Sequence, residues 1–60
     1  MFTATLWVRG PDDINWRLNA NFHRPSWPLA LQRVQVEVNW YNDKGYRTFV
    51  GPDKPELDVP

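Results

Sequence analysis

The chain has 60 residues, of which 42% are hydrophobic, and its seven basic and seven acidic side chains cancel to a formal net charge of zero. A chain of this length forms one domain, near the lower limit at which a core is stable without disulfides, a metal or a partner. It contains no cysteine, which excludes a disulfide and a thiolate site, and its neutral charge does not indicate nucleic-acid binding by bulk charge.

Cellular location is indicated by what the sequence lacks. No stretch approaches the ~20 apolar residues of a membrane span, and no signal-peptide pattern opens the chain. The lack of cysteine fits a reducing compartment. We therefore expect a soluble cytoplasmic protein that does not contact a membrane.

Apolar and polar residues alternate along the first part of the chain, and this period of two is typical of strands with one buried face. The pattern predicts a first strand from 2 to 9 and a second from 14 to 23, joined by a turn at Gly10-Pro11-Asp12-Asp13. The buried positions are expected to be the even-numbered ones: Phe2, Ala4, Leu6 and Val8, then Ile14, Trp16, Leu18, Ala20 and Phe22.

Two prolines interrupt this alternation and introduce a predicted helix. Ser26 is a plausible N-cap, and Pro28 is tolerated in a first helical turn because its missing N–H would be unpaired there anyway. The residues that follow favour helix. We expect a short helix over 27–33 that packs on the sheet.

The segment from 33 to 41 has two interpretations. A strand over 33–41 is favoured by the alternation of Val34, Val36, Val38 and Trp40, since valine fits a strand better than a helix. A turn at 42–45 closed by Gly45 and a strand over 46–50 would then follow. The alternative is one longer helix that ends near Gly45. Its apolar stripe would be Trp27, Leu31, Val34, Val38 and Tyr41.

The predicted fold class is therefore α+β. The favoured arrangement is a small antiparallel sheet of two hairpins with one short helix, ββαββ, and the alternative is ββαβ with a longer helix. Residues 1–51 form a single compact domain, and residues 52–60, rich in proline, form an extended tail.

No motif in the chain indicates catalysis. His23 is the one histidine and has no local partner to orient it as a base, and Asp12, Asp13 and Asp43 are explained by turns rather than by a calcium loop. There is no Gly-rich phosphate loop, nucleophile elbow or suitable carboxylate pair. We expect no enzyme activity, no catalytic, cofactor or metal residues, and no small-molecule substrate.

The outward face of the predicted sheet combines arginines with aromatic residues, which are enriched at binding hot spots. We expect it to bind a protein, with arginines against an acidic surface and aromatic rings in pockets. Single-stranded nucleic acid is an alternative partner, and so is a second small core in which residues 52–60 cover Trp7 and Phe49. The candidate partner-binding residues are Trp7, Arg9, Arg17, Tyr41, Arg47 and Phe49.

Three short segments carry a resemblance to a known family: Phe2-Thr3-Ala4-Thr5, Trp40-Tyr41, and Gly45-Tyr46 with a β segment that ends at Pro52. In these segments the chain resembles the transcription inhibitor of T7-like phages. In size and element order it is also similar to other small phage host-takeover proteins, including anti-CRISPR proteins. The T7-like family has a helix where this chain has Val34 to Val38.

The resemblance implies a viral, phage-encoded inhibitor that acts in the host cytoplasm by occupying a surface of a host complex, either RNA polymerase or a CRISPR effector. Two other functions stay open at this point. The chain would then be a small single-stranded nucleic-acid-binding protein or an accessory subunit of a larger assembly.

Overall fold

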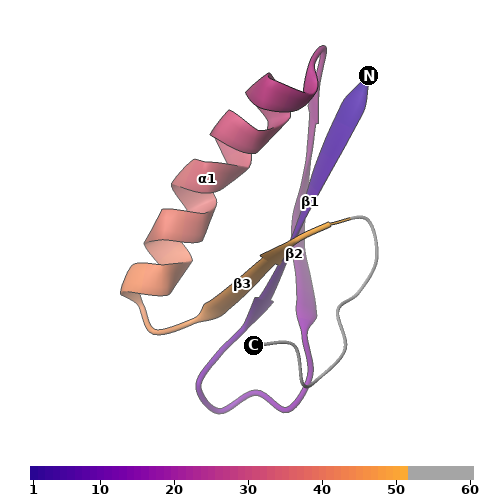
Figure 1. Ribbon diagram of the computed structural model, residues 1–60. Helices are drawn as coiled ribbons and strands as arrows, with labels where there is room; N and C mark the ends of the chain where they lie inside the picture. Colours follow the sequence, from indigo (N-terminus) through magenta and orange to yellow (C-terminus); the bar gives the residue numbers. More distant parts are fainter. Residues whose placement is uncertain (52–60) are drawn as a thin grey trace.

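The computed structural model describes residues 1–51, so the predicted tail at 52–60 lies outside the described residues. The elements in chain order are β1 (Phe2–Arg9), β2 (Arg17–Arg24), α1 (Trp27–Asp43) and β3 (Arg47–Val50). The strands form one antiparallel sheet in the order β2-β1-β3, and α1 lies along one face of it (Figure 1). The predicted α+β class is confirmed, and the arrangement is the alternative ββαβ with the longer helix.

The preferred prediction of a strand over 33–41 was wrong, because these residues belong to α1. The helix begins after Ser26, whose Oγ accepts a hydrogen bond of 3.4 Å from the Leu29 N–H. One helical stripe is buried against the sheet, with Ala30 and Val34 at 0% and 1% exposure. Since the intrinsic penalty for valine in a helix is below about 1 kcal/mol, burial of this stripe outweighs it.

The end of α1 is fixed by a Schellman motif. The Tyr46 N–H donates to the Tyr41 carbonyl at 2.9 Å, and the Gly45 N–H donates to the Asn42 carbonyl at 3.1 Å. Gly45 has φ 87°, and the rings of Tyr41 and Tyr46 pack edge to face with centroids 5.3 Å apart. The turn predicted at 42–45 therefore ends a helix and does not join two paired strands.

A β-bulge in β2 changes which side chains face α1. Leu6 pairs with Ala20 but Trp7 pairs with Leu18, which leaves Asn19 as an extra residue. Before the bulge Arg17 shares the helix side with Val8, and Leu18 shares the far side with Trp7. The expected burial of Leu18 was thus wrong, and this side chain is 54% exposed. The predicted start of the second strand at 14 was also wrong, because β2 begins at Arg17; Ile14 lies in the preceding loop and is 75% exposed. Phe2, at the start of β1, was expected to be buried and is 50% exposed.

The core lies between α1 and the central strand β1. Its buried members are Ala4, Leu6, Val8, Ala30 and Val34, and the partly buried residues packed against them are Phe22, Val38, Tyr41, Tyr46 and Val50. Every other element therefore contacts a core that β1 and α1 define. Among residues 1–51, no helix has both the length and the apolar character needed to cross a membrane.

Truncation of two neighbouring valines tests the orientation of α1. We expect Val34→Ala to lower the free energy of unfolding by about 2 kcal/mol, because Val34 is 1% exposed and the change removes buried methyl groups. Val36→Ala should change it by less than ~0.5 kcal/mol, because Val36 is 62% exposed. Urea denaturation of both variants measures the difference, and equal losses would contradict the helix.

Substitution of Gly45 tests the helix end. Its φ of 87° is unfavourable for a side chain, while nothing lies within 4 Å of an added Cβ, so the effect should be conformational. We expect Gly45→Val to lower the free energy of unfolding by more than ~1 kcal/mol. Gly45→Asn should lower it less, since Asn tolerates this conformation. Thermal unfolding measures the order, and an equal effect of both would argue against the Schellman motif.

Candidate protein-docking groove

The structure separates the six predicted partner-binding residues into two groups. On the sheet face away from α1, Trp7 pairs with Phe49 and Arg9 pairs with Arg47. Arg17 and Tyr41 lie on the helix side, because the bulge reverses the orientation of Arg17 and because Tyr41 belongs to α1. The six residues therefore do not form the single outer face that the alternation predicts.

The aromatic residues on the face away from α1 are packed rather than open. Trp16 is 3% exposed, and its ring lies edge to face with that of Phe49 at a centroid distance of 6.3 Å. Trp7 is half-buried, and its indole N–H is buried without a hydrogen-bond partner among residues 1–51. Arg9 Nε donates to the Asp13 carbonyl at 3.2 Å. This group has the packing of a second small core, which weakens it as a docking surface.

Large apolar side chains are instead exposed along one flank of α1. Leu29, Val36 and Trp40 are 47%, 62% and 54% exposed, and their spacing places them on one side of a helix. This flank lies toward β2, because the neighbouring Arg33 guanidinium sits 4.7 Å from the centroid of the Phe22 ring in that strand.

Three depressions follow one another along this flank, and together we call them the α1–β2 groove. The first, of about 470 Å³, is lined by Leu29 and Val36 among others. The second, of about 390 Å³, shares Val36 and adds Trp40 and Tyr41. The third, of about 300 Å³, shares Tyr41 and reaches Arg17. The shared residues make the three depressions neighbours along the helix.

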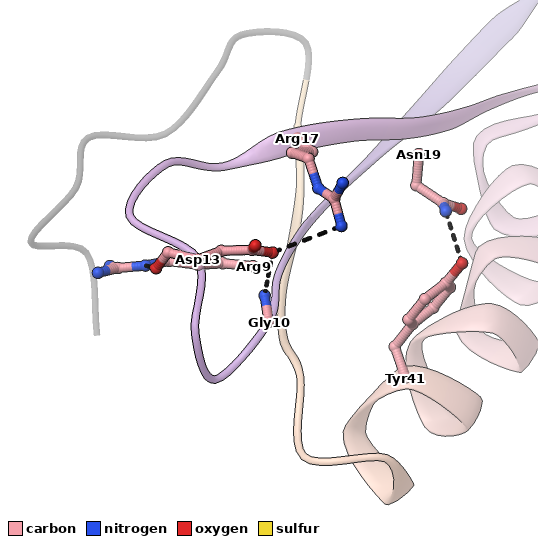
Figure 2. A network of polar contacts seen from close by, with 6 residues as sticks. All are labelled: Arg9, Gly10, Asp13, Arg17, Asn19 and Tyr41. Carbon is pink, nitrogen blue, oxygen red and sulfur yellow. Dashed lines mark hydrogen bonds and ion pairs between the residues drawn. The ribbon is translucent and has the colours of Figure 1, made fainter.

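Polar side chains at and near the bulge form one end of the groove, and Figure 2 shows the contacts among them. The Asn19 side-chain amide donates a hydrogen bond of 2.7 Å to the Tyr41 hydroxyl. Arg17 lies 3.6 Å from the Asp13 carboxylate, which also accepts a hydrogen bond from the Gly10 N–H at 2.8 Å. Because the Arg17 side chain is 66% exposed and this ion pair is long, its guanidinium is free to meet another anion.

The groove is bordered by more positive than negative charge. Arg33 pairs with Glu37 at 3.1 Å, so these two charges neutralise each other. Arg24, at the opposite end from Arg17, has no carboxylate partner within the described part of the chain and donates instead to the His23 carbonyl at 2.7 Å. The ends of the groove are therefore basic, while its middle combines the apolar Val36 and Trp40 with the carboxylate of Glu37, whose charge Arg33 neutralises.

The outer edge of β2 lies beside the groove. In the order β2-β1-β3, β2 is an edge strand that pairs with β1 alone among the strands of residues 1–51 (Figure 1). An edge strand carries backbone N–H and C=O groups without a neighbouring strand, and these are a template for pairing with another chain.

Sequence reasoning missed Leu29, Val36 and Trp40 as site residues. The available signal was their helical spacing, which becomes visible only once 33–43 is read as helix. No sequence signal marked the bulge at Asn19. Within residues 1–51, no group of three or more His, Asp or Glu side chains is placed to hold a metal ion. Comparison with known protein families, curated proteins and solved structures finds no match for this chain.

Removal of one hydroxyl tests the polar end of the groove. We expect Tyr41→Phe to lower the free energy of unfolding by less than ~1 kcal/mol, because water replaces the phenol as the acceptor for the exposed Asn19 amide. The side-chain amide resonances of Asn19 should shift in the NMR spectrum while those of Asn21 stay in place. Unchanged Asn19 resonances would show that the contact is absent in solution.

Proposed function

We propose that the chain is a protein-binding module without enzyme activity, and that it docks through the α1–β2 groove. The observation that carries the proposal is the exposure of Leu29, Val36 and Trp40 along neighbouring depressions beside an edge strand. Contiguous exposed apolar surface with a polar rim is typical of interaction sites. A tryptophan near the middle of such a groove is also the type of residue that dominates binding energy.

The partner that best fits this surface is a host protein complex. The resemblance to small phage host-takeover proteins supports an inhibitor that acts in the host cytoplasm by occupying a surface of RNA polymerase or a CRISPR effector. Arg17 and Arg24 at the ends of the groove favour an acidic patch on that surface. Inhibition in this form needs occupancy of the surface and no chemical step.

Single-stranded nucleic acid fits the groove less well. Trp40 is available for base stacking, but Arg33 is paired with Glu37, and Arg17 and Arg24 lie at opposite ends of the groove, which leaves few cations along its length for successive phosphates. Lys44 Nζ lies 5.3 Å from the centroid of the Trp40 ring and covers part of it. These contacts favour a protein partner over a nucleic acid.

A matched pair of charge insertions tests the proposal. The wild-type chain is immobilised, and the proteins it retains from a bacterial lysate are identified and quantified. We expect Val36→Asp to weaken retention of the bound host protein at least tenfold, equivalent to about 1.4 kcal/mol. Ile14→Asp should leave retention unchanged, because Ile14 is 75% exposed in the loop outside the groove. Circular dichroism confirms that both variants are folded.

Two outcomes would contradict this assignment. If Val36→Asp has no effect while Trp7→Ala or Arg47→Ala abolishes retention, the interface is the sheet face away from α1. If a single-stranded oligothymidine binds with an affinity that falls steeply with salt, the chain is a nucleic-acid-binding protein, since released counterions produce that dependence.

A further inference from the structure

We infer that the occupant of the α1–β2 groove is an extended, acidic segment of the partner that pairs with the outer edge of β2 as an additional antiparallel strand. This inference rests on the proposed protein-binding function and specifies the partner. It predicts a recognition pattern in which two apolar side chains and one carboxylate alternate with residues of other types.

The position of α1 allows a strand at this edge. The helix packs over β1, since Ala30 and Val34 are buried with Leu6 of that strand. Neighbouring strands lie ~4.8 Å apart, so a strand added outside β2 lies ~10 Å to the side of β1. A helix with side chains has a radius of ~5 to 6 Å. The added strand therefore lies beside α1, and its helix-side residues point into the groove.

The length of the groove matches a short strand. From Leu29 to Trp40 the helix rises by ~17 Å at ~1.5 Å per residue. About five residues of a strand cover the same distance, which is within the 8-residue length of β2. Alternate residues of such a segment share one face at intervals of ~7 Å, so three side chains enter the three depressions in turn.

The chemistry of the depressions sets the order of those side chains. The depression at the Arg24 end contains Leu29 and Val36, the middle one contains Trp40, and the one at the other end contains Arg17. An antiparallel strand begins at the Arg24 end of β2 and finishes at the Arg17 end. The residues of the added strand therefore follow the order apolar, any, apolar, any, acidic. The carboxylate of the acidic residue replaces Asp13 as the partner of Arg17.

Charge argues against a second copy of the chain as the occupant. Antiparallel pairing of β2 (Arg17–Arg24) with itself at full overlap places Arg17 opposite Arg24 of the other copy at both ends. Like charges directly opposite each other across strands are destabilising. The segment proposed here places its carboxylate against Arg17 and carries no cation opposite Arg24, so the edge disfavours self-association and favours that partner.

Capped peptides of defined sequence test the inference on the full chain. We expect TVTLTET to bind isotope-labelled protein, to shift the resonances of the β2 amides, and to slow their hydrogen exchange. The charge-reversed TVTLTKT and the reversed-order TETLTVT should bind at least tenfold more weakly. Arg17→Glu should invert the preference between TVTLTET and TVTLTKT. Arg47→Glu, on β3 and facing away from α1, should leave the preference unchanged.

The remaining outcomes overturn the inference in distinguishable ways. Equal binding of all three peptides, or binding without change at the β2 amides, excludes recognition of a strand. A dimer in sedimentation that Val36→Asp dissociates identifies a second copy as the occupant. If no peptide binds but Val36→Asp still abolishes retention of the host protein, the strand is wrong and the protein-binding function stands. If TVTLTET binds but Val36→Asp leaves retention of the host protein unchanged, the proposed function is wrong.

Discussion

The contact between the centre of α1 and the central strand β1 determines most other features of the molecule. Ala4 and Ala30 are both 0% exposed, and such small side chains allow the helix to lie close to the strand. Leu6, Val8 and Val34 fill the remaining space. A single helix, ~10 to 12 Å wide, covers about the two strand spacings that a sheet of three strands spans, so the outer edge of β2 lies at the margin of what α1 can bury. The α1–β2 groove lies along this margin.

The bulge at Asn19 gives this margin its chemistry. In a regular hairpin Leu18 would point toward α1 and Arg17 away from it, as the alternation predicts. The extra residue exchanges the two, so that Arg17 and the Asn19 amide border the groove and Leu18 joins Trp7 on the far face. Bulges that redirect side chains in this way are common beside functional sites, and this one adds a cation to an otherwise apolar groove.

The sequence was sufficient to predict β1, the antiparallel hairpin and the helix start at Ser26, because each follows from local patterns and capping chemistry. It was also sufficient to place an unusual backbone conformation at Gly45, but not to say whether a strand or a helix precedes it. Between 33 and 41 both patterns are present, and they share Val34 and Val38. The strand pattern depends on Val36 and Trp40, which are apolar although they are exposed.

The residues that misled the prediction are therefore the ones that the proposed function uses. An exposed apolar residue contributes little to the stability of the isolated fold, so its presence breaks the agreement between sequence pattern and burial that holds elsewhere. The bulge could not be predicted for a different reason, since Asn19 is compatible with a strand, a bulge or a turn and only pairing with β1 decides among them. β1 and the start of α1 could be predicted from local patterns, whereas the rest of α1 and the groove depend on contacts between distant segments.

The size of the domain connects its stability to its function. A chain of 60 residues buries a smaller fraction of its surface on folding than a larger domain does, and its margin of stability is correspondingly narrow. A partner that covers Leu29, Val36 and Trp40 and pairs with β2 binds only the folded state, so it stabilises the fold in proportion to its affinity and concentration. In the proposed complex the open flank, a weakness of the isolated domain, is also where the partner adds stability, since an added strand supplies edge pairing and apolar contacts that the elements of residues 1–51 leave unmade.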